Sequence, residues 1–338
     1  MSSEPVTTTR LQRGTGWARL RKLVGSVVGR REAGILVVAV ALTIYFQIIT
    51  GRFISGSNFI TVTQLTAATA IIACGEVLLL ICGEIDLSVG NTFALVPFIL
   101  LFCTQADMPL PLAMIVSLAV GGVIGFINGC ITVFLKVPSF VATLGMLFLL
   151  NGLTLTITNG YPSAAPTVGQ ASVVLGSAPA SEILWAVGIL ILMQLLLTRT
   201  RFGPHVIAVG GNMMGARESG VSVPFVKIAS FVMAGVLAGF AGILDSFRVG
   251  SIDPLQGGTE IMFMAVAGAV IGGTALTGGS GTVVGAFLGV VVLSLLNDGF
   301  TFIGISAFAF DIILGGAILV VMVVNVYLGR LRIRRLSQ

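Results

Sequence analysis

The chain has 338 residues, 56% hydrophobic and only 9% charged, which excludes a single water-soluble core because soluble domains are about one quarter charged. Its net charge of +5 does not indicate a nucleic-acid partner, since seven of the 18 basic residues lie within residues 10–31 and four within 330–335, beside apolar runs. Apolar runs of about 17–25 residues recur along the chain and predict a polytopic, all-α membrane protein.

The apolar runs predict ten membrane-spanning helices. An even number places both basic tails on one side, which we expect to be the cytoplasm. The predicted organisation is a basic tail over residues 1–33, a transmembrane domain over 34–328 and a second basic tail over 329–338. The predicted spans are residues 34–50, 60–82, 89–106, 111–135, 139–158, 182–198, 225–244, 260–276, 283–297 and 306–327.

Charged residues near the span ends sort by side under this count. The basic residues that join the tails on the inner side are Lys136, Arg199, Arg201, Arg217 and Lys227, whereas Arg52 and Arg248 fall outside. The acidic residues at the outer face are Asp107, Glu182, Asp245, Asp253, Glu260 and Asp298. Counts of eight or twelve spans do not separate the basic and acidic residues in this way, so ten is favoured.

Glycines recur at every fourth position within or directly beside three of the predicted spans. Such faces of small residues let helix backbones approach closely inside a membrane bundle. They predict tight helix packing within one chain. The glycines are Gly121, Gly125 and Gly129, then Gly235 and Gly239, then Gly281, Gly285 and Gly289.

A short acidic break, GEIDLSVG, separates the second and third spans. Gly83 and Gly90 bracket two carboxylates, Glu84 and Asp86, in apolar surroundings. A charge at the bilayer centre costs about 2.5–3.5 kcal/mol on insertion scales, so such groups need a partner, water or a helix end. Asp86 or Ser88 can cap the third helix, and a role in translocation or gating stays open.

A second stretch, GSIDPLQG from Gly250 to Gly257, matches the first break at both glycines, the isoleucine and the aspartate. The first break follows the second span on the inner side, and this one follows the seventh span on the outer side. The match therefore predicts two halves with inverted topology. Asp253 precedes Pro254, a typical cap and first-turn pair, and a gating role again stays open.

Glu76 lies in the middle of the second span, where no helix end is available to it. Intramembrane acids usually face the bundle interior or a cavity, so we expect the same here. A proton relay would need a basic or histidine partner, which the neighbouring sequence does not supply. The candidate translocation or gating residues are therefore Glu76, Gly83, Glu84, Asp86, Ser88, Gly90 and Asp253.

The longest inner loop, residues 199–224, has a helix signature of its own. Asn212 is a good N-cap, MMGARES predicts about two helical turns, and Gly220 suits the position after a helix. The segment predicts a short helix parallel to the membrane that carries Arg217 and Glu218. An ordinary connecting loop is the simpler interpretation of these residues on their own.

Three motifs that occur in order resemble the permease subunits of bacterial ABC importers for simple sugars, the ribose type. They are GEIDLSVG, the loop pattern TRFG…AVGGN…AR.SGV, and VIGGTALTGGSGTVVGAFLG at residues 270–289. The resemblance covers about residues 34–328. In that family the segment corresponding to Gly211–Val221 is a coupling helix that docks on the ATPase subunit. The resemblance implies this contact for Gly211, Asn212, Ala216, Arg217, Glu218, Ser219 and Gly220.

Two residues depart from the family pattern: Glu84 stands where glycine is usual, and Glu76 differs from the usual residue of its helix. Both departures leave the identity of the sugar open. The family otherwise implies a multi-pass protein of the bacterial inner membrane that imports a simple sugar or related polyol by alternating access.

The implied partners are a second permease chain, cytoplasmic ATPase subunits, a periplasmic substrate-binding protein and membrane lipid, with no nucleic acid. No G-x-x-x-x-G-K-[ST] motif occurs in the chain. We therefore expect a transport subunit that is not itself an enzyme and holds no cofactor, with ATP and Mg²⁺ bound by the ATPase.

Two other functions stay open at this stage. A proton-driven secondary transporter would use Glu76, Glu84 or Asp86 and would work without an ATPase. A permease for a non-sugar solute, such as branched-chain amino acids or nucleosides, would share the general architecture.

Overall fold

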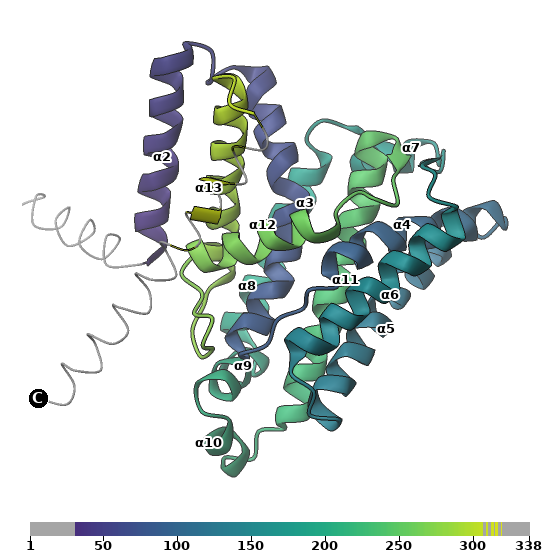
Figure 1. Cartoon of the computed structure of the whole chain (residues 1–338), viewed down its shortest axis with the longest axis vertical. Helices are drawn as coiled ribbons and strands as arrows, with labels where there is room; N and C mark the ends of the chain where they lie inside the picture. The colour runs from purple at the N-terminus through teal and green to yellow at the C-terminus, as the bar shows by residue number, and fades with distance from the viewer. Residues whose placement is uncertain (1–30, 307–308, 310–311, 314, 317–318, 320–338) are drawn as a thin grey trace, which may run out of the picture.

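The computed structural model describes residues 31–306 and, beyond them, residues 309, 312, 313, 315, 316 and 319. Nearly all of the predicted tails and most of the predicted tenth span lie outside the described residues. Figure 1 shows a bundle of helices. In the described part of the chain they are accompanied by one pair of two-residue strands. The prediction of an all-α polytopic membrane protein is confirmed.

Each of the nine predicted spans before residue 306 corresponds to one helix. These helices are α2 (Arg31–Thr50), α3 (Gly56–Ile81), α4 (Val89–Gln105), α5 (Leu110–Phe134), α6 (Ser139–Thr158), α8 (Ser181–Arg199), α11 (Val223–Val249), α12 (Gly258–Ile271) and α13 (Val283–Phe302). By length and composition, seven can cross a membrane, while α4 and α12 are shorter apolar helices. The remaining elements are β1 (Ser163–Ala164), α7 (Gln170–Ser172), the π-helical turn η1 (Val173–Ser177), α9 (Phe202–Gly211), α10 (Met213–Glu218) and β2 (Ser251–Ile252).

Two long helices extend beyond their predicted ends for identifiable reasons. The α3 helix begins four residues early because the Ser55 hydroxyl accepts the backbone N–H of Asn58 at 3.3 Å, which caps the helix there. The α11 helix continues past residue 244 and carries Asp245 and Arg248 in its last turns. It ends at Gly250, whose φ of +78° is a left-handed conformation that suits glycine.

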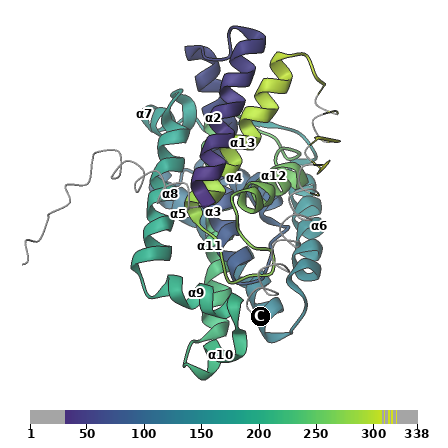
Figure 2. The same ribbon diagram turned by 90° about the vertical axis from the view of Figure 1, so that its left-hand side faces the viewer.

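The bundle has two distinct ends. At one end, which we call the α10 end, the C-terminus of α3 meets α9 and the turn before α13, with Gly279 N donating to Ile81 O at 2.8 Å. At the other, the β1–β2 end, the two strands pair antiparallel, and Ala165 N donates to Gly250 O at 3.1 Å. Figures 1 and 2 both place α9 and α10 at one extremity and α7 near the opposite one.

The two halves of the chain have matching helices with opposite directions. An offset of 167 residues, the difference between Gly250 and Gly83, superposes the bounds of α3 on α11 and brings α4 and α5 close to those of α12 and α13. The α3 helix ends at the α10 end, whereas α11 begins there. Helix packing shows the same correspondence. The α11 helix packs on α5 and α4, and its counterpart α3 packs on their counterparts α13 and α12. The predicted inverted repeat is therefore confirmed over these helices.

The core lies around α3 and α11. From Thr66 to Ile81, every residue of α3 is buried. Glycines permit the closest helix contacts: a Cβ on Gly121 would meet the carbonyl oxygen of Gly235, and one on Gly125 would meet that of Phe231. The glycine face of α5 thus packs against α11 within this chain, as its spacing predicted.

Candidate functional site

The first break forms a buried polar cluster around Asp86. One oxygen of its carboxylate accepts the backbone N–H of Ser88 at 2.8 Å and the Ser88 hydroxyl at 2.6 Å. The other accepts the side-chain amide of Asn128 at 3.1 Å. All three residues are 5% exposed or less. Ser88 is the N-cap residue of α4, but its own side chain makes no cap bond, so Asp86 fixes the helix start through Ser88.

Sequence reasoning did not find Asn128. It lies on α5 beside the glycine face, and a single asparagine in an apolar span was the available signal. Its amide also donates to Ser88 Oγ at 2.9 Å, which joins α5 to the break.

Asp86→Ala is expected to destabilise the protein more than Asp253→Ala. Removing the Asp86 carboxylate leaves buried donors on Ser88 and Asn128 without an acceptor, each costing about 1–3 kcal/mol. Asp86→Asn should be milder because its amide oxygen can still accept from Ser88. Thermal unfolding in detergent measures this, and equal midpoints for the two alanine variants would contradict the expected order.

The aspartate of the second break is less buried than that of the first and lies farther from the helix that follows it. Asp253 is half-buried, and its carboxylate accepts the backbone N–H of Leu255 at 2.9 Å, which repeats the bond between Asp86 and Ser88. The N-cap residue of α12 is Gly257, four residues farther on. The prediction that Asp253 and Pro254 start this helix is therefore wrong, because the chain makes an additional turn before α12.

Glu76 is fully buried in the middle of α3, as predicted for an acid that faces the bundle interior. Neither carboxylate oxygen makes a well-formed hydrogen bond within the described part of the chain, although the backbone N–H of Asp86 approaches them. Glu76 therefore belongs to the surroundings of the Asp86 cluster.

Glu84 forms an ion pair with Lys227, in which the lysine ammonium donates to the carboxylate. The two side chains are only 11% and 14% exposed. The pair joins the end of α3 to the beginning of α11 at the α10 end. The sequence placed both residues on the inner side but gave no sign that they meet, since 143 positions separate them.

Glu84→Gln and Lys227→Met are each expected to lower the free energy of unfolding by about 1.5–3 kcal/mol, the usual range for hydrogen bonds to charged groups. The double variant should recover part of this loss because no unpaired charge then remains. A double-mutant cycle measured by chemical unfolding gives the coupling. Arg199→Met, an exposed change at the same end, is the control. Additive losses would exclude the pairing.

The two breaks bring the N-termini of α4 and α12 into direct contact inside the bundle. A Cβ on Gly90 would overlap the carbonyl group of Gly258, and one on Gly257 would meet the ring of Phe93. Gly83 and Gly257 have φ values of +77° and +86°, which an L side chain rarely adopts. The bracketing glycines therefore permit a close backbone contact between the halves.

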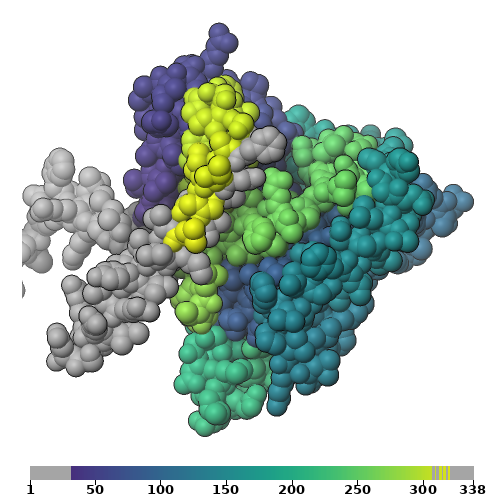
Figure 3. Space-filling view, in the orientation of Figure 1, coloured from purple at the N-terminus to yellow at the C-terminus, as the bar shows by residue number. Residues whose placement is uncertain are grey.

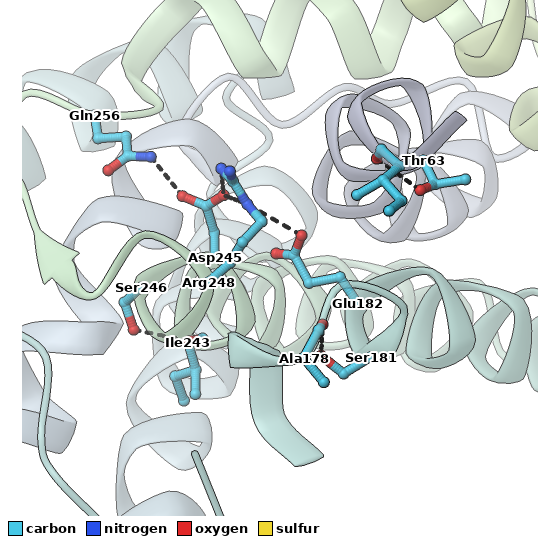
Figure 4. Close-up of polar contacts among 10 residues, drawn as sticks. Thr63, Ala178, Ser181, Glu182, Ile243, Asp245, Ser246, Arg248 and Gln256 are labelled. Atoms are coloured by element: carbon cyan, nitrogen blue, oxygen red, sulfur yellow. Dashed lines mark hydrogen bonds and ion pairs between the residues drawn. The ribbon is translucent and has the colours of Figure 1, made fainter. Parts of the chain in front are cut away.

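At the β1–β2 end, charged side chains from α8 and α11 form a second network (Figure 4). Arg248 lies between two acids, with its Nε 3.1 Å from Glu182 Oε2 and 3.1 Å from Asp245 Oδ1. The amide of Gln256 donates to the second oxygen of Asp245. Sequence reasoning sorted these charges correctly to one side but did not predict that they meet. No group of His, Cys, Asp and Glu that could hold a metal ion is found within the described residues.

The α9 and α10 helices form the tip of the α10 end, where Figure 3 shows them projecting below the bundle. The Asn212 side chain accepts the backbone N–H of Gly215 at 3.0 Å, and Gly220 follows α10 with a φ of +82°. The predicted short helix and both of its ends are confirmed. Among the predicted coupling residues, Ala216 is buried and Gly211, Asn212, Arg217, Glu218, Ser219 and Gly220 are exposed.

The α9 helix, which sequence reasoning missed, connects this tip to the core. A Cβ on Gly210 would overlap the carbonyl oxygen of Ile81, at the end of α3, and would meet Gly279. The α9 helix is therefore in close backbone contact with the end of α3, which leads into the first break. Pro204 and three glycines within α9 explain why its sequence did not indicate a helix.

Comparison with known proteins gives matches along most of the chain. Residues 58–322 match the family described as "Branched-chain amino acid transport system / permease component". A xylose/arabinose import permease protein of Sulfolobus acidocaldarius is 40% identical over 312 residues, which are 90% of this chain and 87% of the relative.

Two further relatives have comparable coverage. An autoinducer 2 import system permease protein of Salmonella typhi is 35% identical over 311 residues, 90% of this chain and 88% of the relative. A ribose import permease protein of Escherichia coli (strain K12) is 32% identical over 296 residues, 86% of this chain and 92% of the relative. No solved structure matches the chain.

Proposed function

The chain belongs to the permease-component family of the branched-chain amino acid transport systems, and from this premise we propose that it is the membrane-spanning subunit of an ATP-driven importer. It moves a simple sugar or related polyol through the inner membrane by alternating access. Relatives named for xylose/arabinose and for ribose support a sugar as the solute. The chain carries out no chemistry on that solute.

The observation that carries this proposal is α10. It is a six-residue helix with a side-chain cap at its beginning and a left-handed glycine after its end, on the tip of the bundle. Met213 and Met214 are exposed beside Arg217 and Glu218, so the tip presents both apolar and charged groups. Such a surface suits a protein partner, because exposed methionines pack on irregular apolar surfaces and charged groups form strong hydrogen bonds.

In this proposal α10 docks on a cytoplasmic ATPase subunit, which holds the ATP and Mg²⁺. The α10 end and both basic tails then face the cytoplasm, in keeping with the basic residues gathered there. A substrate-binding protein delivers the sugar to the β1–β2 end. Two copies of the permease complete the transporter, each with one ATPase.

The movement that opens the path follows from the packing around α9. Closure of the ATPase subunits on ATP displaces α10, and the contact of Gly210 with Ile81 transmits this displacement to α3. The Glu84–Lys227 pair joins α3 to α11 at the same place, so both central helices respond together.

Uptake by reconstituted vesicles tests the proposal. The permease, its ATPase and its binding protein are placed in proteoliposomes and supplied with radiolabelled ribose, xylose, arabinose, leucine or adenosine. We expect sugar uptake that requires ATP and the ATPase and that is unaffected by collapsing a proton gradient. Uptake by the permease alone, driven by a proton gradient, would identify a secondary transporter. ATP-driven uptake of leucine or adenosine in place of sugars would show that the chain imports another class of solute.

A further inference from the structure

A pocket of about 240 Å³ lies between five helices toward the β1–β2 end. Its wall comes from both halves of the chain, with α3 and α4 on one side and α11, α12 and α13 on the other. The close contact between Gly90 and Gly258 lies beside it, since Gly257 and Phe93 line the pocket.

The pocket is lined by polar side chains that have no partner. The side chains of Gln64, Thr69, Glu260, Ser294 and Asn297 make no hydrogen bond or ion pair with any other residue that the structure describes. Thr69 and Ser294 are nevertheless buried, at 8% and 2% exposed. Unpaired polar groups inside a membrane bundle are costly unless they face water or a ligand. Because these side chains converge on one pocket, the pocket is suited to a polar ligand.

The charged part of the wall is held in place by the network of Figure 4. Asp245 bonds to Arg248 and to the amide of Gln256, and all three residues line the pocket. Arg248 also forms an ion pair with Glu182 on α8, which does not line the pocket. The arginine is thus neutralised, and Glu260 leaves the wall with an excess of negative charge. An anionic solute is therefore disfavoured.

We propose that this pocket binds the transported sugar as a single neutral ring, an inference that rests on the proposed import of a sugar. The amides of Gln64 and Asn297 each supply both donors and an acceptor, which is what adjacent hydroxyl groups require. The ring of Phe93 supplies an apolar surface for the C–H face of the sugar. The volume lies below the roughly 300–1,000 Å³ of drug-sized sites, so it fits a monosaccharide and excludes longer oligosaccharides.

Cysteine protection in the assembled transporter tests the proposal. Asn297→Cys is introduced after Cys74, Cys82, Cys103 and Cys130 are replaced by alanine, and the complex with its ATPase is placed in vesicles. A membrane-impermeant thiol reagent is added in the presence of ribose, xylose or arabinose, with leucine as the comparison solute. The sugar that the vesicles import should slow modification by about tenfold, which corresponds to about 1.4 kcal/mol, and leucine should not.

Gln105→Cys is the matched control, because it lies on exposed α4 surface at the same end but outside the pocket. Its modification should be unaffected by sugar. Protection at both positions would mean a general change of accessibility and would contradict a site at Asn297.

A second measurement uses Gln64→Ala and Asn297→Ala. The binding protein determines the half-saturating sugar concentration for uptake, so the maximal rate is the informative quantity. It should fall about tenfold in each variant, with ATPase co-purification unchanged. ATP-driven sugar uptake with no protection at Asn297→Cys and unchanged maximal rates would overturn the pocket while leaving the proposed function intact. Absence of ATP-driven sugar uptake by the unmodified chain would instead overturn the proposed function itself.

Discussion

Arg217→Glu and Gly220→Val are expected to abolish both ATPase co-purification and uptake while the permease still inserts and folds. Arg217 is exposed on α10, where no membrane or core contact requires its charge. Reversing that charge opposes any acidic partner group, and charge-assisted bonds are among the strongest that an exposed side chain makes. The effect should therefore fall on docking and not on stability.

Gly220 acts through backbone geometry. Its φ of +82° is a left-handed conformation, and a Cβ there would meet no atom within 4 Å. The expected defect of Gly220→Val is thus backbone strain at the end of α10, because β-branched residues disfavour this conformation. Gly220→Asn is the matched control, since asparagine tolerates a left-handed φ, and it should retain docking.

Affinity purification of the complex and vesicle uptake measure the outcome, with size-exclusion chromatography to check folding. Arg201→Glu, an exposed charge reversal at the same end but outside α10, should leave the complex intact. If Arg217→Glu and Gly220→Val both co-purify with the ATPase and transport normally, docking lies elsewhere. The turn over residues 274–282 is then the next candidate, because Leu276 and Thr277 are exposed there.

Gly90→Val is expected to cause one of the largest losses of stability among single changes in the bundle. A Cβ at this position overlaps the carbonyl group of Gly258; the backbone fixes the position of a Cβ, and the carbonyl is itself backbone, so neither can rotate away. Overpacking in a well-packed core costs about 1–3 kcal/mol when side chains can adjust. Here the starts of α4 and α12 must separate, so we expect a loss at or above that range and little folded protein.

Gly90→Ala tests the same contact with the smallest possible group, and its yield and unfolding temperature should lie between those of Gly90→Val and the unmodified chain. Gly145→Ala, on α6 with nothing within 4 Å of its Cβ, should have no measurable effect. A Gly90→Val variant that unfolds at the same temperature as Gly145→Ala would show that the helix starts are not in contact in the membrane.

The sequence predicted the helices well because hydrophobic runs and glycine spacing are local signals. Nine spans were placed within a few residues, and the inverted repeat was visible from one matched octapeptide. The missed elements have weak local signals: α9 contains Pro204 and several glycines, and α7 with its π-helical continuation lies in a stretch expected to be an outer loop.

The candidate site was predicted in part. Asp86, Glu76 and α10 were identified because a carboxylate in an apolar span and a cap-to-cap signature are visible in the chain itself. Their partners were not, because Asn128, Lys227 and Arg248 are brought to them by tertiary packing between distant segments. The expected cap at Asp253 failed because the turn before α12 is longer than the match between the breaks suggested.

The inverted repeat has a consequence for the direction of movement. If the two halves exchange conformations, an opening at one end is replaced by an equivalent opening at the other. The side chains at equivalent positions of the two halves differ, however. At the 167-residue offset, the counterparts of Gln64, Asp245, Arg248, Gln256 and Asn297 are Phe231, Leu78, Ile81, Val89 and Cys130. The four apolar counterparts are fully buried, so the hydrogen-bonding wall near the β1–β2 end has no equivalent near the α10 end. The backbone is thus nearly symmetric, whereas the polarity of the two ends is not.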